Sequence, residues 1–319
     1  MIDLIYVLIL LISFGVTVAL TPYVMRFMRR HDIVGRDMNK PGMPIRPEMG
    51  GVAVVLGFFS GAFVFIYYQR AALNTAMMAL LFGIMGCAFT GILDDLLNLR
   101  RYIKAVLPFF FALPVGLVMR WDTLDFSVVG LVITSAWIVP LLIPFGITCG
   151  ANATNMLEGL NGLGTGLALI AASTLAVIGY LTGNIAGLWL LFPLIGALAA
   201  FLIYNIYPAK VFPGDTLTLS VGGIIASAAI ASGLLVWGIV LFSPMILEFI
   251  LKTRGRFKAR NQGEIDKDGR LHQKSKRIES LTHLVMHIKP MKEWQIVGMF
   301  WLIEGIIGVM TISLMSVIV

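Results

Sequence analysis

The sequence predicts an all-α fold, a polytopic membrane helix bundle of about ten transmembrane helices. Hydrophobic residues make up 58% of the 319 residues, charged residues make up 13%, and the mean hydropathy is +0.90. A soluble globular protein carries far more charge than this. The Lys and Arg residues also cluster: 22 of the 24 fall into four basic segments between long uncharged runs, and only Arg70 and Arg120 lie elsewhere. These basic segments are 26–50, 94–104, 205–215 and 252–293.

The uncharged runs are long enough for the predicted helices, because a spanning helix needs about 20 predominantly apolar residues. The chain is expected to turn at Gln69-Arg70, at Thr182-Gly183-Asn184 and near Ser232-Gly233. We expect one membrane domain, residues 1–319, in which 252–293 is a cytoplasmic substrate-binding loop. The ten predicted spans lie near 4–25, 51–69, 73–93, 104–120, 128–147, 163–181, 186–206, 217–233, 235–252 and 296–316.

Membrane proteins collect Lys and Arg in cytoplasmic loops, so the four basic segments should share the cytoplasmic face and the N-terminus should lie outside. The first span does not read as a removable signal peptide, because Asp3 precedes it and Arg26 follows it. Cys87 and Cys149 give no hint of a disulfide framework. We expect an integral protein of the cell membrane that binds no nucleic acid.

Asp94 and Asp95 end the third predicted span, where acidic groups oppose the helix dipole. If the helix continues, Asp94, Asn98 and Arg101 share one face by their spacing. Lys104 follows at the start of the next span. A solvated loop with Asp–Arg pairs would also explain this pattern, but acids at a membrane edge favour a functional site.

Two further polar segments interrupt the apolar sequence. Asn152, Asn155 and Asn161 lie among glycines, which predicts an irregular backbone lining a cavity. Asn oxygens suit a hard cation and Asn amides suit phosphate or base edges, although one Asn could instead cap the helix near Leu163. Asp215 follows Pro-Gly at a helix start, so it is either an N-cap or a metal ligand.

Several other polar groups have simpler explanations. The first basic loop and the segment Lys252–Lys258 each look like a positive-inside signature, although paired Arg forks also match phosphate oxygens. His283 and His287 are four apart but lack a third metal ligand. Glu248 and Glu304 lie inside predicted spans, so they should face the bundle interior with partners.

An ordered set of motifs on one membrane face carries a resemblance to a known family. The set is Asp94-Asp95 with Asn98 and Lys104, the Asn155/Asn161 segment, and Phe212-x-Gly-Asp215. It resembles the polyprenyl-phosphate N-acetylhexosamine-1-phosphate transferase family, of glycosyltransferase 4 type. Further motifs resemble its archaeal and eukaryotic branch, which acts on UDP-N-acetylglucosamine (UDP-GlcNAc) and dolichyl phosphate. These are Asp37-Met38-Asn39-Lys40, Pro47-Glu48, Leu97-Asn98-Leu99-Arg100 and Arg254-Gly255-Arg256.

The resemblance implies roles for individual residues around the nucleotide and the metal. Asn155 and Asp215 match Mg²⁺ ligands, with Mn²⁺ as the alternative ion. Asn161 and Phe212 match uridine-binding positions. Met38 matches a backbone contact to the uracil.

The remaining roles concern the sugar and the acceptor. Glu48, Arg254 and Arg256 match contacts to the amino-sugar nucleotide. Lys104 matches the lysine that contacts the lipid phosphate. Asp94-Asp95 matches the essential acidic pair, so we count it, with Lys104 and Asp215, as catalytic.

Asn98 is counted among the substrate-binding residues. The chain departs from the family pattern at Arg36, where a Gln-like residue is usual, and at Gly255, where a His is usual. Both departures concern sugar contacts. The last loop lacks the long insertion of the eukaryotic enzymes, which favours an archaeal-type source.

The implied reaction is attack of a polyprenyl-phosphate oxygen on the β-phosphorus of UDP-GlcNAc, with release of UMP. It is the first membrane step of lipid-linked oligosaccharide and N-glycan assembly. The second pKa of a lipid phosphate is about 6, so the reaction requires no general base. Asp94 and Asp95 are then expected to position the acceptor phosphate or the metal shell, with proton removal as the lesser alternative. Membrane lipids are further partners, and a homodimer is left open.

The sequence leaves two alternative functions open. A bacterial-type transferase would act on undecaprenyl phosphate in cell-wall or surface polysaccharide assembly, but a His-rich motif usual in that branch does not occur here. An ion-coupled transporter or lipid scrambler would also use membrane acids and broken helices, with its sites near the midplane and in inverted repeats. A nonenzymatic lipid-binding scaffold would not need the acidic and Asn motifs.

Overall fold

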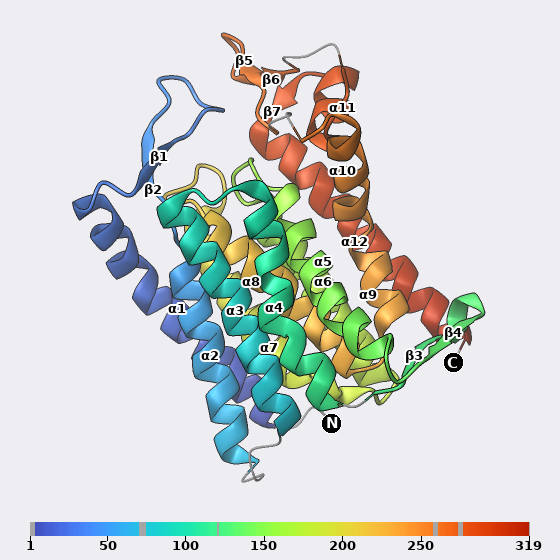
Figure 1. Ribbon diagram of the computed structural model, residues 1–319. Coiled ribbons are helices and arrows are strands. Elements are labelled where there is room, and N and C mark those ends of the chain that lie inside the picture. The colour runs from blue at the N-terminus through green and yellow to red at the C-terminus, as the bar shows by residue number, and fades with distance from the viewer. Residues whose placement is uncertain (1–3, 70–74, 120, 258–260, 274–276, 319) are drawn as a thin grey trace.

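The computed structural model describes residues 4–69, 75–119, 121–257, 261–273 and 277–318. These residues form a helical bundle, which confirms the predicted all-α membrane fold (Figure 1). The long helices are α1 (Leu4–Arg30), α2 (Gly51–Tyr68), α3 (Thr75–Leu97), α4 (Arg101–Met119), α5 (Val139–Met156), α6 (Leu163–Leu181), α7 (Leu188–Asn205), α8 (Gly214–Ala231) and α12 (Glu293–Ile318).

Short elements lie between and beyond these helices. Three short helices follow α8, namely α9 (Leu235–Leu241), α10 (Ser243–Arg254) and α11 (Leu281–Ile288). The strands pair antiparallel as β1 with β2, β3 with β4, and β5–β6–β7. Their bounds are β1 (Val34–Arg36), β2 (Ile45–Pro47), β3 (Thr123–Phe126), β4 (Leu131–Thr134), β5 (Glu264–Ile265), β6 (Arg270–His272) and β7 (Met291–Lys292).

In the described chain, eight helices are long and apolar enough to cross a membrane, and the bent pair of α9 and α10 makes a possible ninth. Helix α5 lies near the fifth predicted span, but Asn152 and Asn155 lower its hydropathy. The number of ten spans therefore stays a prediction. The expected turns at Thr182–Asn184 and Ser232-Gly233 are confirmed, whereas Arg70 lies outside the described residues.

The basic segments lie at one end of the bundle, which we call the basic end. Figure 1 shows β1–β2, the α3–α4 connection, α10, α11 and β5–β7 at its upper end. Helix α1 begins, and α12 ends, at the opposite end. The predicted grouping of the basic segments is thus present in the fold. That this end faces the cytoplasm stays a prediction.

The span predicted at 128–147 is wrong in its first half. Residues 123–134 form the β3–β4 hairpin, in which Leu124 lies opposite Ile133, and α5 begins only at Val139. Val and Ile are strongly apolar but favour strands over helices. Hydropathy alone therefore cannot tell such a strand from a spanning helix. Pro140 then suits the first turn of α5, where no backbone N–H is needed.

Helix α8 is the centre of the bundle. In α8, 78% of the residues of the apolar stretch are buried, against 22% in α4. Helix α8 packs against α3, α5 and α2. Small residues allow this close packing. A Cβ added at Gly222 would lie 2.1 Å from the Gly150 carbonyl oxygen of α5. One turn away, Thr154 Oγ1 donates to the Thr218 carbonyl oxygen at 2.6 Å, which fixes α5 against α8.

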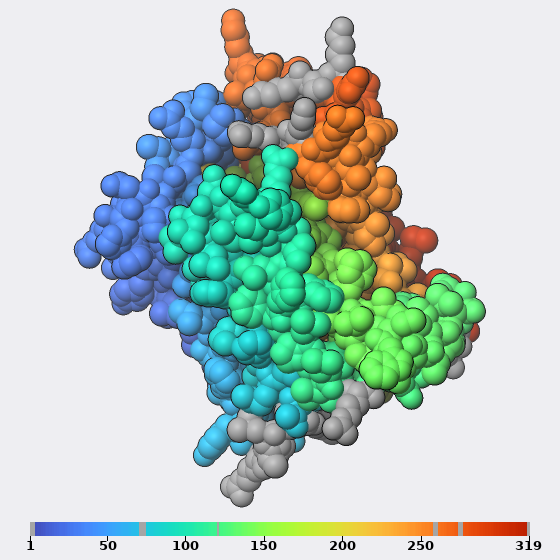
Figure 2. Space-filling view, viewed as in Figure 1, coloured from blue at the N-terminus to red at the C-terminus, as the bar shows by residue number. Residues whose placement is uncertain are grey.

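The predicted span 235–252 is broken rather than straight. Helices α9 and α10 meet at Phe242 with a 61° bend, and Pro244 in the first turn of α10 cannot donate a backbone hydrogen bond to α9. An apolar cavity of about 370 Å³ lies between the bent pair, α5, α8 and the β3–β4 hairpin. Figure 2 shows α5, in yellow-green, set back between α4 and the orange α10.

The two acids expected inside spans differ in their surroundings. Glu248 is fully buried and accepts from Ser280 Oγ at 3.1 Å and from Leu281 N at 2.7 Å, so its predicted partners exist. Glu304 is also fully buried in α12. Its two carboxyl oxygens have no hydrogen-bond partner among the described residues, which therefore do not supply the predicted partner.

Gly91 allows α3 to approach the start of α8. A Cβ there would lie 2.4 Å from the Asp215 carbonyl oxygen and 2.5 Å from Thr216 Cα, and a backbone cannot yield as a side chain does. We expect Gly91→Ala to lower the free energy of unfolding by about 1–3 kcal/mol, measured by thermal unfolding in detergent. The control is Gly298→Ala on α12, where a Cβ meets nothing within 4 Å. Equal melting of both variants would contradict this account of the packing.

Candidate active site

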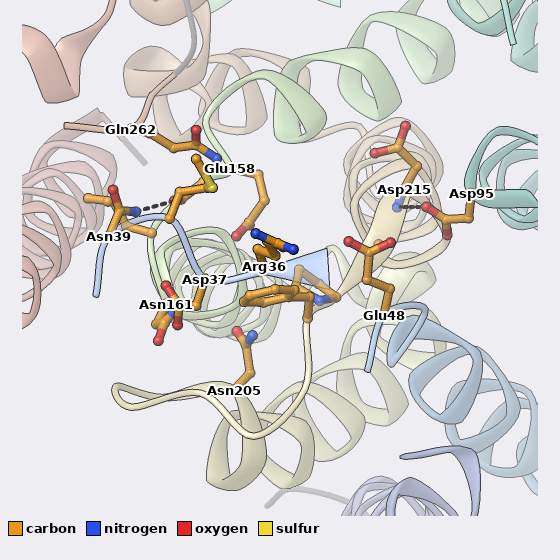
Figure 3. Close-up of a pocket in the computed structure, with 16 residues that line it drawn as sticks. Arg36, Asp37, Asn39, Glu48, Asp95, Glu158, Asn161, Asn205, Asp215 and Gln262 are labelled. Atoms are coloured by element: carbon orange, nitrogen blue, oxygen red, sulfur yellow. Dashed lines mark hydrogen bonds between the residues drawn. The ribbon is translucent and has the colours of Figure 1, made fainter. Parts of the chain in front are cut away.

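A polar cavity of about 280 Å³ opens at the basic end (Figure 3). The first basic loop, the end of α3, and the α5–α6 and α7–α8 connections line it, together with Gln262. Segments far apart in sequence therefore meet here, as expected if the basic segments share one face of the membrane. The predicted site residues in its lining are Met38, Glu48, Asp95, Asn161, Phe212 and Asp215.

Beside this cavity, Lys104 joins two carboxylates from different helices. We call Asp94, Lys104 and Asp215 the acid–lysine cluster. Lys104 Nζ donates to Asp94 Oδ2 at 2.8 Å and also to Asp215 Oδ2. All three side chains are only partly exposed, at 13–25%, so this pairing is less screened by water than a surface ion pair. The predicted catalytic residues of α3, α4 and α8 thus come together.

Asp95 has a different partner from Asp94. Its Oδ1 accepts from Asp215 N at 2.7 Å (Figure 3). Its Oδ2 accepts from Thr216 N at 3.0 Å and from Thr216 Oγ1 at 2.6 Å. Asp95 therefore caps α8 from another helix, near the positive end of the α8 dipole. The alternative in which Asp215 is the N-cap is wrong, because Pro213 occupies that position and Asp215 lies in the first turn.

The end of α3 explains how Asp94 reaches Lys104. The helix stops at Leu97, and Asn98 has a left-handed backbone with φ 50°, a conformation that Asn tolerates at helix ends. Leu99 N then donates to Asp94 Oδ1 at 2.9 Å. The expected helical face of Asp94, Asn98 and Arg101 does not form, because the chain turns there. Asn98 is exposed and lies outside the cavity lining.

On the other side of the cavity lies a second buried cluster, which we call the Lys40 cluster: Asp37, Lys40, Asn161 and Glu293. Lys40 Nζ donates to Asp37 Oδ2 at 2.5 Å, to Glu293 Oε2 at 3.0 Å and to Asn161 Oδ1. Glu293 Oε1 in turn accepts from Asn161 N at 2.7 Å. Each member is at most 8% exposed, so these charges are paired inside the protein.

The α5–α6 connection presents Asn161 because glycines allow its backbone. Gly159 has φ 140° and Gly162 has φ 80°, values that residues with a Cβ rarely adopt. Asn39 Nδ2 donates to the Gly159 carbonyl oxygen at 3.0 Å, which ties this connection to the first basic loop. Gly162, and no Asn side chain, occupies the N-cap position of α6.

Asn155 lies on α5, because the irregular backbone begins only after Met156. Its Nδ2 donates to Thr218 Oγ1 at 3.0 Å, and Thr218 Oγ1 donates to the Asp215 carbonyl oxygen at 3.3 Å. The two predicted metal ligands are therefore linked through Thr218 at the start of α8. Nδ2 is committed to Thr218, which leaves the Asn155 amide oxygen as the group suited to a cation.

The carboxylate and amide groups at the cavity can be compared with the ligands that a metal ion needs. Among the described residues, no three His, Cys, Asp or Glu side chains gather as a metal cage. Mg²⁺ does not need such a cage, because one or two carboxylates suffice when phosphates and water supply the other oxygens. Asp94 and Asp215 already flank a cationic group, the Lys104 ammonium. The residues present therefore fit Mg²⁺.

Two further carboxyl groups line the cavity with perturbed acidity. Burial, assisted by the charge of Asp95, raises the pKa of Glu48. Burial also raises the pKa of Glu158 to about 7, although the Gly159 and Gly164 N–H groups oppose the shift. Glu158 Oε2 is sealed from water and has no hydrogen-bond partner in the described chain. Near neutral pH the cavity thus contains a carboxyl group that changes charge.

Other predicted substrate-binding residues are not in the cavity lining. Arg254 and Arg256 are exposed at and just after the end of α10, and Arg254 donates to the Ile278 carbonyl oxygen. Within 252–293, the cavity is lined by Gln262. Asn261 Nδ2 next to it donates to the carbonyl oxygens of Met156, at 3.0 Å, and Glu158, at 2.6 Å, and so fastens this segment to the end of α5.

Three residues of the site were not assigned from the sequence. Lys40 and Glu158 were visible within motifs, but they looked like a basic-loop residue and a loop acid. Glu293 had no local signal beyond its place at a helix start. Its partners are 132 and 253 residues away in the chain, so the fold alone identifies it.

Comparison with known proteins gives one consistent result. The family model described as glycosyl transferase family 4 matches residues 77–233, which contain the acid–lysine cluster and Asn161. A Saccharolobus solfataricus protein is 36% identical over 96% of each chain, and a Sulfolobus acidocaldarius protein is 35% identical over 96% of this chain and 95% of its own. Both carry the provisional name UDP-N-acetylglucosamine–dolichyl-phosphate N-acetylglucosaminephosphotransferase.

Bacterial proteins also match over most of their length. The phospho-N-acetylmuramoyl-pentapeptide-transferase of Bacillus licheniformis is 26% identical over 94% of this chain and 95% of its own. The archaeal proteins named above are more similar than this. Because these identities extend over nearly the whole chain, and the matched region carries the clustered acids, lysine and amides described above, the protein is an integral membrane enzyme that belongs to glycosyl transferase family 4.

Proposed function

We propose that the protein transfers N-acetylglucosamine-1-phosphate from UDP-GlcNAc to a polyprenyl phosphate of dolichyl type and releases UMP. The names of the two archaeal relatives support these substrates. The observation that carries the proposal is the acid–lysine cluster, in which Lys104 pairs with Asp94 and with Asp215, a residue that also lines the polar cavity. A reaction between an anionic nucleotide sugar and an anionic lipid phosphate needs charged groups of both signs at one place.

The apolar cavity extends along α5 from Leu142 to Ala153, three residues before the end of this helix. Ala153 lines this cavity, and its neighbour Asn152 donates through Nδ2 to the Ala105 carbonyl oxygen at 3.0 Å. Lys104 is the residue before Ala105. An isoprenoid chain in the apolar cavity would therefore bring its phosphate toward the ammonium of Lys104. On the other side, Asp215 belongs both to the cluster and to the lining of the polar cavity.

The chain's own residues can position both reactants. Lys104 would hold the anionic acceptor phosphate, and Phe212 and Asn161 would hold the base at the other side of the polar cavity. Phosphoryl transfer depends mainly on such positioning and on neutralising charge. Because Asp95 uses both oxygens to cap α8, we assign it the positioning of Asp215 and no proton transfer.

A divalent cation completes the proposal. The polar cavity is lined by five acidic residues and one Arg, an environment that repels an anionic nucleotide unless a cation is bound. These residues are Asp37, Glu48, Asp95, Glu158, Asp215 and Arg36. Asn155 and Asp215 would hold Mg²⁺, or Mn²⁺ in its place. The ion would supply charge neutralisation and polarisation of the phosphoryl group.

The orientation in the membrane is part of the proposal. The clustering of Lys and Arg at the basic end supports a cytoplasmic active site and an external N-terminus. The 252–293 segment would cover the nucleotide side, because Gln262 lines the cavity and Asn261 fastens the segment to α5.

The direct test is transfer by purified protein. Labelled UDP-sugars, Mg²⁺ and dolichyl or undecaprenyl phosphate should yield UMP and a labelled pyrophosphoryl lipid, best with UDP-GlcNAc and dolichyl phosphate. Lys104→Met should lower kcat by about 100-fold or more, because one charged contact to the reacting groups is lost. The exposed Lys267→Met serves as control. Preference for undecaprenyl phosphate would favour the bacterial-type reaction, and no transfer with any sugar would refute the proposal.

Asp94 and Asp95 should differ when each is changed to Asn. Asp95→Asn loses one acceptor at the start of α8, so the free energy of unfolding should fall by about 1 kcal/mol and kcat should fall with it. Asp94→Asn should reduce kcat more than stability, because it weakens the hold on Lys104. The measurements are melting temperature and rate against pH. Recovery of Asp95→Asn activity at high pH would instead make Asp95 a general base.

Glu158 predicts a pH dependence of nucleotide binding. Its raised pKa, about 7, leaves the carboxyl mostly neutral at pH 6 and mostly anionic at pH 8. The added negative charge in the cavity should raise the KM for UDP-GlcNAc across this range, by about two- to tenfold for roughly 1 kcal/mol of repulsion. Glu158→Gln should remove the rise, and a KM profile unchanged by this substitution would contradict the assignment.

A further inference from the structure

Of the three Asn residues that the sequence singles out before α6, Asn152 has no part in the reaction proposed above. It lies on α5, three residues before Asn155, and is half-buried. Its Nδ2 donates to the Ala105 carbonyl oxygen of α4 at 3.0 Å and to the Thr148 carbonyl oxygen of α5 at 2.9 Å. Backbone carbonyls can only accept, so the atom between them must be the amide nitrogen, and both its hydrogens are used. Asn152 therefore joins α5 to the residue that follows Lys104.

The first turn of α4, which carries Lys104, is weakly held by its own helix. Pro108 has no backbone N–H, so the Lys104 carbonyl oxygen lacks the donor that an ordinary helix supplies four residues later. Packing adds little there, because Lys104 is only partly buried and the other residues from 101 to 106 are exposed. Contacts from neighbouring elements must therefore fix the position of Lys104.

Helix α5 supplies one such contact and also fixes the partner of Lys104. Asn152 donates to α4, whereas Thr154 donates to the Thr218 carbonyl oxygen of α8 at 2.6 Å. Residues two positions apart lie on nearly opposite sides of a helix, so α5 holds α4 on one side and α8 on the other. Asp215 lies in the first turn of α8. Both members of the Lys104–Asp215 pair are thus placed relative to α5.

Arg101 makes a second contact from the same turn, but to a different part of the chain. Its Nη1 donates to the Phe257 carbonyl oxygen at 2.8 Å. Phe257 follows the end of α10 within the 252–293 segment, so this bond ties α4 to that segment and not to α8. Of the two contacts, that of Asn152 is the one that relates Lys104 to the helix holding α8.

We propose that Asn152 is a positioning residue for the transfer reaction. It replaces the support that Pro108 removes from the first turn of α4, and so holds the Lys104 ammonium between Asp94 and Asp215. This inference rests on the proposed function, because it takes Lys104 as the group that meets the acceptor phosphate. Asn152 acts on the reactants through Lys104.

The first test is steady-state transfer by the purified protein with UDP-GlcNAc and dolichyl phosphate. Asn152→Leu, which keeps the size and removes the donor, should lower kcat/KM for dolichyl phosphate by about tenfold, the order expected when one hydrogen bond that places a charged group is lost. The KM for UDP-GlcNAc should stay within about twofold. Asn152→Ser is polar but too short to reach Ala105, and should show the same loss. The control Asn184→Leu removes an exposed Asn between α6 and α7 and should change neither value.

Rescue by a second substitution separates positioning from a general loss of stability. Pro108→Ala restores a backbone N–H for the Lys104 carbonyl oxygen, so Asn152→Leu should cause a loss of no more than about threefold in that background. Pro114→Ala restores an N–H further along α4 and should rescue nothing. In a Lys104→Met background, Asn152→Leu should change the rate by less than about twofold, because the group that it positions is gone. An equal loss in every background would refute the inference.

Hydrogen exchange gives a readout that needs no activity. Backbone amides of residues 101–107 should exchange faster in Asn152→Leu than in wild type, and at the wild-type rate once Pro108→Ala is added. If wild type transfers GlcNAc-1-phosphate but Asn152→Leu keeps the wild-type kcat/KM or the wild-type exchange, the inference is wrong and the function stands. If wild type transfers no sugar phosphate to any lipid, the proposed function fails, whatever the exchange rates show.

Discussion

The contact between the end of α3 and the start of α8 sets the geometry of the site. Gly91 lets the two backbones approach, and Asp95 then accepts hydrogen bonds from the first turn of α8. Because α8 is the buried centre of the bundle, its first turn cannot shift without disturbing α5 and α2 as well. Asp215 therefore faces Lys104 in a position fixed by packing and capping together.

The two clusters beside the cavity share one arrangement. Lys104 lies between Asp94 and Asp215, and Lys40 lies between Asp37 and Glu293. In each, one cation is paired with two acids, so burial of the charges is offset by short contacts, and the acids remain in excess. Lys104 holds helices α3, α4 and α8 together, whereas Lys40 holds loops to α12. The same kind of charge pairing therefore fixes both the helices beside the cavity and the loops that line it.

Much of this was predictable from the sequence, and the failures have physical causes. Long apolar runs and clustered Lys and Arg identified the membrane bundle, but hydropathy could not separate the β3–β4 hairpin from a helix or reveal the bend at Phe242. Asp95, Asn161 and Asp215, each part of a predicted motif, line one cavity, and Asp94 lies beside it. The different partners of Asp94 and Asp95 depend on how α3 meets α8, and contacts between distant segments leave no mark in local sequence.

The bend between α9 and α10 bears on how a lipid substrate enters and leaves the enzyme. The space between the bent pair, α5 and the hairpin is apolar along its length, and the bent pair is long and apolar enough to cross a membrane. An isoprenoid substrate would enter this space laterally from the surrounding bilayer. After it had accepted the sugar phosphate, it would leave by the same route. Only the nucleotide would then exchange with water, so supply of the lipid would depend on diffusion in two dimensions.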